Sequence, residues 1–321
     1  MKIISFIVRT PFALFHGGWT RLAIGLQWAF CLIDRKSVRL RALEYLRQGA
    51  RLQAMRWEGE QDYPVYVINR TKDVDRMSRF ALSCQKWEIK YERMEAINCA
   101  DPEFNFSPHE AEIAETFYGK KQFLRGAVGC FLSHVKVWRQ ILKANIPGAM
   151  ICEDDAHFLG PIPRKFTTYH FPENCDLVFV NQRTATGIQN LSNNSTKSSF
   201  DFFPINDAIL YLLDVCSSIS AIGTDGYVIT RQGAGKLLEI FQKVRVSMEV
   251  DWFLLFHSLS QDERKNFIAK DGTGRFDILE FDAEKLNTYV IVPFFVEQSS
   301  TNSTIGFDNP KNYIDRKLIR K

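Results

Sequence analysis

From residue 65 onward, apolar strand-length runs alternate with stretches that favour helices. Residues 65–68 (VYVI) form a short apolar run bounded by Pro64 and by a polar segment. Short apolar runs bounded by turn-forming residues predict buried strands. We therefore expect a strand at 65–68, a helix from Val74 to about Lys86 and a second strand within 89–97.

The most regular pattern begins near residues 126–129. An apolar residue recurs there every three or four positions, at Val128, Phe131, Val135, Trp138 and Leu142. This spacing places the five side chains on one face of a helix. A turn then leads into a strand at 149–152. Repeated strand and helix segments are typical of an α/β domain with a mostly parallel central sheet.

Three later segments extend this pattern. Residues 175–181 (CDLVFVN) predict a strand, and another strand ends near Thr230, with a helix beginning at about Gln232. Residues 288–300 predict a late strand that Pro293 interrupts, because proline cannot donate to a strand ladder. This strand should therefore lie at an edge or change direction.

Residues 1–60 have a different character. They carry ten Lys/Arg and four Asp/Glu, whereas the rest of the chain has a net charge of about −2. Their uncharged run at 22–33 is shorter than the roughly 20 residues of a spanning helix. Three alternatives stay open: a helix lying on an anionic membrane, a signal anchor that tolerates Arg21 and His16, or a helical hairpin packed on the main domain.

The composition indicates an ordinary globular protein. The chain has 321 residues, 45% hydrophobic and 24% charged, which excludes global disorder and coiled coil. Its seven cysteines show no Cys-x-x-Cys spacing, and we expect them to be reduced thiols in a reducing compartment. The basic excess is confined to residues 1–60, and we expect no nucleic-acid partner.

Three consecutive acids follow the predicted strand at 149–152. Glu153, Asp154 and Asp155 repel one another at neutral pH, so water or a cation must compensate them. A solvated turn or helix cap is one interpretation. The other is a metal site, because ligands gather at the carboxyl ends of parallel strands and Mg²⁺ or Mn²⁺ prefers oxygen ligands. If strand geometry continues, Glu153 and Asp155 point the same way and Asp154 faces the other side.

Five motifs occur in a characteristic order over residues 62–305. They are VINRTKDVDR, RGAVGCFLSHVKVW, ICEDDA, TDGYVITRQGAGKLL and VDW. Together they resemble glycosyltransferase family 25, which includes lipooligosaccharide galactosyltransferases and collagen galactosyltransferase domains.

The resemblance implies a GT-A-like single catalytic domain at 61–321, preceded by the N-terminal helical extension at 1–60. It also implies a UDP-sugar donor, usually UDP-galactose or UDP-glucose, a divalent cation (Mn²⁺ or Mg²⁺) and inversion at the anomeric carbon. Glu153 and Asp155 would hold the cation, which would stabilise the diphosphate leaving group.

An inverting transfer needs a general base opposite the leaving group. Asp251, among apolar neighbours in EVDWF, is the first candidate, because partial desolvation would raise its pKa. Asp225 is the second candidate. The alternative for Asp251 is an N-cap of the helix that follows it.

Other positions match the family motifs near the expected donor site. An arginine there can hold a diphosphate or brace its loop against an acidic side chain. Ser133 and His134 could instead pack their helix beneath the site. The candidates for donor binding are Asn69, Arg70, Arg76, Ser133, His134, Asp154, Gln298 and Ser303.

These features predict an inverting, metal-dependent glycosyltransferase that moves a hexose, most simply galactose, from UDP to a saccharide. The expected acceptor belongs to lipopolysaccharide, lipooligosaccharide or a related lipid-linked surface glycan, and the expected location is the cytoplasm, peripheral on the inner face of the membrane. One alternative is an inactive scaffold that binds a nucleotide sugar or glycan. Another is a phosphotransferase or hydrolase that uses the acids for metal chemistry.

Overall fold

A computed structural model describes the parts of the chain that build an α/β domain. The described residues are 63–99, 101, 103–108, 110–111, 122–160, 171–172, 174–181, 201–205, 223–244, 249–265, 285–292, 294–299 and 313–315. The predicted extension at 1–60 and the candidate Ser303 lie outside them. No helix within these ranges combines the length and apolar character needed to cross a membrane.

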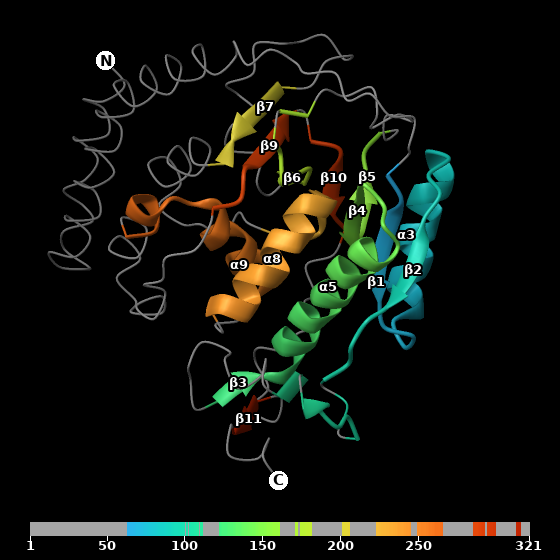
Figure 1. Cartoon of the computed structure of the whole chain (residues 1–321). Coiled ribbons are helices and arrows are strands. Elements are labelled where there is room, and N and C mark those ends of the chain that lie inside the picture. Colours follow the sequence, from blue (N-terminus) through green and yellow to red (C-terminus); the bar gives the residue numbers. More distant parts are fainter. Residues whose placement is uncertain are drawn as a thin grey trace, which may run out of the picture.

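A seven-stranded sheet forms the centre of the domain (Figure 1). Its order is β2-β1-β4-β8-β6-β9-β7, and five strands run in one direction while β8 and β7 run against them. This confirms the prediction of an α/β fold on a mostly parallel sheet. The bounds are β1 Val65–Asn69, β2 Glu92–Glu95, β4 Gly148–Glu153, β6 Leu177–Phe179, β7 Asp201–Pro204, β8 Gly226–Thr230 and β9 Thr288–Val292.

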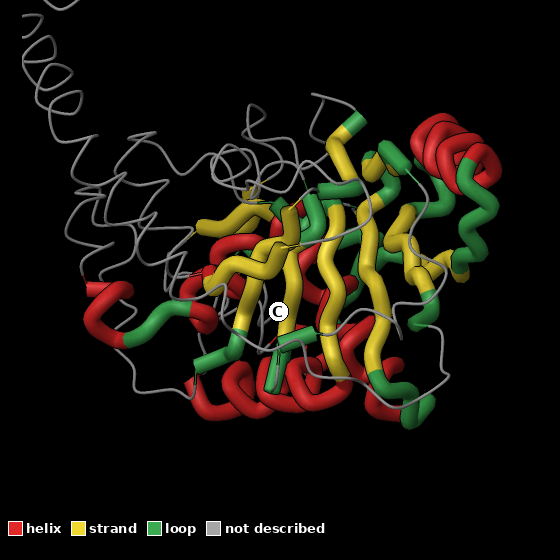
Figure 2. Tube along the Cα trace, turned by 90° about the horizontal axis from the view of Figure 1, so that it is seen from above, coloured by secondary structure: helices red, strands yellow, loops and turns green. Residues whose placement is uncertain are grey.

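Alternate residues of the strands supply two separate cores. In β1, Tyr66 and Ile68 pack into one core, whereas Val65 and Val67 pack into the other. The first core holds the buried faces of three helices, and the second holds one. Figure 2 shows helices along one face of the strands and a further helix beyond the opposite face. The helices are α5 Arg125–Lys143, α8 Arg231–Val244 and α9 Val250–Ser258 in the first core, and α3 Val74–Lys86 in the second.

Two small sheets flank the large one. β5 (Ala156–Phe158) pairs with β10 (Val296–Gln298), and β3 (Gln122–Leu124) pairs with β11 (Tyr313–Asp315), each antiparallel. Val296 pairs parallel with Asn181, as β9 does with β6, so the predicted change of direction stays a prediction. β9 ends in the large sheet at Val292 and β10 lies in a different sheet, so the chain changes sheets between them. This change brings β10 beside the segment that follows the acidic triplet.

Candidate functional site

A pocket lies where β1 and β4 end. Both strands run parallel, so the loop after β1 and the acidic triplet after β4 meet at the same edge of the sheet. α5 and the segment after β2, residues 96–99, form the remaining walls. The polar or ionisable lining residues are Asn69, Arg70, Asp73, Arg76, Asn98, Cys99, Cys130, Ser133, His134, Glu153 and Asp154.

Asp154 joins the two strand ends. The side-chain amide of Asn69 donates to Oδ2 of Asp154 over 2.8 Å, and Nε of Arg76 donates to Oδ1 over 2.6 Å. Asp154 is 6% exposed, so both carboxylate oxygens are bonded in a buried setting. Arg76 therefore makes the bracing contact that was one of its two expected roles, and its binding to a diphosphate stays a prediction.

Asp155 is bonded through only one of its oxygens. Its Oδ2 accepts from the Gln298 amide over 2.9 Å and lies 3.1 Å from a guanidinium nitrogen of Arg76, whereas its buried Oδ1 has no hydrogen-bond partner among the described residues. Burial and the charge of Glu153 raise the pKa of Asp155 to about 6, against the lowering effect of Arg76 and Gln298. The fold thus holds a carboxylate whose negative charge is incompletely compensated.

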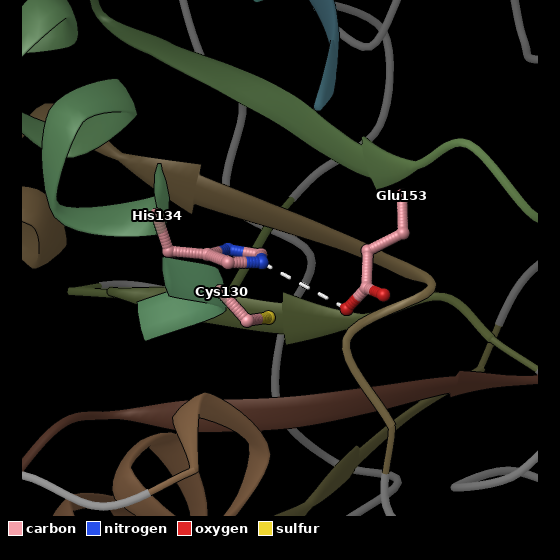
Figure 3. Close-up of side chains that lie close together, drawn as sticks. All are labelled: Cys130, His134 and Glu153. Carbon is pink, nitrogen blue, oxygen red and sulfur yellow. Dashed lines mark ion pairs between the residues drawn. The ribbon is translucent and has the colours of Figure 1, made fainter. Parts of the chain in front are cut away.

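Glu153 turns toward a third set of partners. The Thr224 hydroxyl donates to its Oε1 over 2.5 Å, and Nε2 of His134 lies 3.8 Å from the same oxygen (Figure 3). Burial alone would raise the pKa of Glu153, but the contacts with His134, Thr224 and Arg76 outweigh it and lower the pKa to about 2. Glu153 therefore stays ionised at neutral pH.

A close backbone approach places α5 against this edge. A Cβ at Gly129 would lie 2.5 Å from the carbonyl oxygen of Ile97, so only glycine lets the helix come this near. The Ser133 hydroxyl accepts from the backbone N–H of Ile97 over 2.8 Å and donates to the carbonyl of Gly129 over 2.6 Å. These bonds fasten the helix to the segment after β2, and a contact of Ser133 with the donor stays a prediction.

Two further candidates lie in the loop after β1. Nε of Arg70 pairs with the carboxylate of Asp73 over 2.5 Å. Asn69, already bonded to Asp154, accepts from Nε of Arg93 over 2.8 Å through its Oδ1. The loop is thus held by its own ion pair and by bonds to β2 and β4.

Neither candidate base is among the residues that line the pocket. Asp225 directly follows Thr224, which bonds Glu153, and is 2% exposed. Asp251 lies in the first turn of α9, and its Oδ1 accepts from the Trp252 N–H over 2.9 Å. The alternative of Asp251 as N-cap is wrong, because Glu249 occupies that position. Their roles as bases stay predictions.

The acidic triplet offers oxygen ligands to a divalent cation. The guanidinium of Arg76 interacts with all three carboxylates, and within the described residues a buried oxygen of Asp155 has no hydrogen-bond partner. Hard oxygen donors of this kind suit Mg²⁺ or Mn²⁺. Glu153 and Asp154 line the pocket whereas Asp155 does not, so binding of a cation by Glu153 and Asp155 stays a prediction.

The sequence did not predict that Thr224, Tyr227 and Trp138 contribute hydrogen bonds to the site. The Tyr227 hydroxyl contacts Nδ1 of His134 over 2.8 Å and accepts from the indole N–H of Trp138 over 3.0 Å. Two of these residues lie in the quoted motif TDGYVIT, and the third lies in the apolar stripe of α5. In the sequence, the available signal for a role in the site was the polar atom that each of these three side chains carries.

Comparison with known proteins places this geometry in a family. The sequence model described as "Glycosyltransferase family 25 (LPS biosynthesis protein)" matches residues 62–254, more than half of the chain. This span includes β1, the triplet, α5 and Asp251. The matched motifs are therefore those that build the pocket.

Three relatives agree with this match. Procollagen galactosyltransferase 1-A of Xenopus laevis is 23% identical over 70% of this chain and 35% of its own length. A Haemophilus influenzae protein named as a candidate glycosyltransferase is 25% identical over 58% of this chain and 60% of its own length. A Rattus norvegicus family 25 member, named as one expected to be inactive, is 24% identical over 29% and 17%.

The chain thus matches less than two thirds of the length of each of these relatives. The family match itself runs from β1 into the first half of α9, and the relatives support glycosyl transfer in general. From the pocket-building motifs and the family match together, we conclude that the chain belongs to glycosyltransferase family 25.

Proposed function

We propose that the protein is an inverting, metal-dependent glycosyltransferase that moves a hexose from a UDP-sugar, most simply UDP-galactose, to a saccharide hydroxyl. The observation that carries the proposal is the division of the acidic triplet. Asp154 braces the pocket through Asn69 and Arg76, while Glu153 and Asp155 are directed to other partners beside it.

Each part of the site then has a task. Glu153 and Asp155 would hold the divalent cation, which when bound offsets the charge that builds on a departing diphosphate. Asp251, or Asp225 as the second choice, would accept the proton of the attacking hydroxyl. Thr224 and Gln298 would keep the two metal-binding carboxylates in place.

Donor binding and turnover test the proposal together. The full chain is mixed with UDP-galactose, UDP-glucose or UDP-N-acetylglucosamine, with Mn²⁺ or with EDTA, and both thermal unfolding and UDP release are measured. One hexose donor at 100 times its dissociation constant should add about 2.7 kcal/mol of stability, only with the cation present. Protection by none of the donors, or equal protection in EDTA, contradicts the proposal.

The acceptor and location extend this proposal. We propose a lipid-linked saccharide of lipopolysaccharide, lipooligosaccharide or a related glycan, reached from the inner face of the membrane through residues 1–60. The basic and aromatic composition of that segment supports the idea. Flotation of the full chain with anionic, but not zwitterionic, vesicles is the expected result, and equal behaviour with both would contradict it.

The alternative is an inactive scaffold that binds a nucleotide sugar or glycan. One observation favours it: Asp154 and one oxygen of Asp155 already have partners within the protein, so part of the triplet is satisfied without any cation. The scaffold predicts donor protection without UDP release for any saccharide acceptor. Measurable transfer excludes it.

A further inference from the structure

A buried row of side chains runs behind the acidic triplet, from Trp138 through Tyr227 and His134 to Glu153. Trp138, Tyr227 and His134 are fully buried, and His134 and Glu153 line the pocket. We propose that His134 is a positioning residue that carries its proton on Nε2, directs it at Glu153, and is held in this state by Tyr227 and Trp138. The role of Glu153 as a metal ligand rests on the proposed function, whereas the position of the proton on His134 does not.

Counting hydrogen-bond donors determines the direction of each bond. The indole N–H of Trp138 can only donate, and it lies 3.0 Å from the Tyr227 oxygen. The hydroxyl proton of Tyr227 must therefore point elsewhere. Within the described part of the chain, its other hydrogen-bond contact is Nδ1 of His134 at 2.8 Å. Tyr227 thus donates to Nδ1.

The opposite arrangement leaves a donor without an acceptor. If Nδ1 of His134 carried a proton, it and Trp138 would both donate to Tyr227, whose own proton would have no partner among the described residues. A buried donor without a partner is costly.

With Nδ1 accepting, the proton of the neutral ring lies on Nε2. This nitrogen faces Oε1 of Glu153 at 3.8 Å, as Figure 3 shows. The imidazole stacks on the Tyr227 ring with centroids 5.7 Å apart and an interplanar angle of 21°, so its orientation is determined by packing. At 3.8 Å the contact is longer than a hydrogen bond, so Nε2 and Glu153 interact electrostatically.

A competing interpretation uses the same residues as a metal site. Ligand atoms of Cys130, His134 and Glu153 lie within 4.8 Å of one another, and such a set would suit Zn²⁺. Coordination through Nε2 requires the proton on Nδ1, the arrangement that leaves the Tyr227 hydroxyl without an acceptor. The hydrogen-bond count therefore favours positioning over coordination.

Nitrogen NMR on the ¹⁵N-labelled full chain tests the protonation state directly. The long-range ¹H–¹⁵N pattern of His134, assigned by its loss in His134→Gln, should show the Nε2–H form. Tyr227→Phe should shift the Nδ1 signal by removing its donor, whereas the matched control Tyr289→Phe should leave it unchanged. A proton on Nδ1 overturns the proposal.

Metal addition provides the second arm. One equivalent of Co²⁺ should produce no thiolate charge-transfer band in the near ultraviolet. Such a band in the wild type that disappears in Cys130→Ser would establish coordination and overturn the positioning role.

Two substitutions then separate positioning from packing. Glutamine at 134 can place an amide N–H near the position of Nε2, whereas asparagine reaches only the position of Nδ1. His134→Asn should weaken Mn²⁺ binding, followed by its EPR signal, by about 10- to 100-fold, with His134→Gln recovering much of that loss. Equal affinity in both variants and the wild type overturns the proposal.

The outcomes also distinguish this inference from the proposed function. If the wild type binds Mn²⁺ but transfers no sugar, the proposed function fails and the affinity comparison still applies. If the wild type binds no Mn²⁺, the metal-dependent function fails, while the NMR experiment still decides the state of His134 and its dependence on Tyr227.

Discussion

Asp154 and Asp155 are neighbours in the chain but have opposite surroundings. Both oxygens of Asp154 are bonded, to Asn69 and Arg76, in a buried contact between two strand ends. Asp155 has one bonded oxygen and, among the described residues, one buried oxygen without a partner, and its pKa is raised to about 6 by burial and by Glu153. Of the two acids, Asp154 is fully bonded within the protein, whereas Asp155 keeps one oxygen for its proposed contact with a metal ion.

Removing the charge of Asp155 should have the largest effect, and it should fall on activity. Asp155→Asn should lower kcat by about 100-fold or more, because a group that stabilises transition-state charge is lost. Its stability in urea should equal or exceed that of the wild type, since an incompletely compensated buried charge disappears. The matched control is Asp262→Asn, which changes an exposed acid. A marked loss of stability in Asp155→Asn would show that Asp155, like Asp154, stabilises the fold.

Truncating Asp154 should act mainly on stability. Asp154→Ala leaves Arg76 and Asn69 without their buried partner, and the free energy of unfolding should fall by about 3 kcal/mol. Urea denaturation measures the change, with Asp262→Ala expected within about 0.5 kcal/mol of the wild type. A change equal to that of the control would show that the brace does not stabilise the fold.

The pH dependence of stability should report the raised pKa of Asp155. A folded-state pKa of about 6, above the unfolded value of 3.8, means that Asp155 binds its proton more tightly when folded. Its contribution therefore favours folding below about pH 4 and is lost as the pH rises to about 6. The stability of Asp155→Asn relative to the wild type should rise across this window and level off above it; a flat difference contradicts the raised pKa.

The smallest effect is expected at Arg70. Its ion pair with Asp73 is partly exposed, and Arg70→Ala should cost about 1 kcal/mol or less. Enzyme kinetics then test its predicted donor contact, because loss of a diphosphate contact raises KM for the UDP-sugar. An unchanged KM would assign Arg70 to the loop alone.

Much of the fold was predictable because its signals are local. The helix expected from Val74 to Lys86 has these bounds, and the apolar stripe from Val128 to Leu142 lies within α5. The strand expected within 89–97 forms only at Glu92–Glu95. The antiparallel insertion of β8 between β4 and β6 was not predicted, because strand pairing depends on contacts between distant segments.

The same distinction between local signals and distant contacts applies to the candidate site. The sequence by itself determined that three carboxylates follow a buried strand and that an Asn/Arg loop follows another, because local pattern and strand polarity suffice for both. Only the tertiary structure decided which partner each acid receives: Arg76 lies 78 residues from Asp154, Thr224 lies 71 from Glu153, and Gln298 lies 143 from Asp155. Burial and charge compensation arise from such distant neighbours, so three adjacent acids acquire different surroundings only when the sheet assembles.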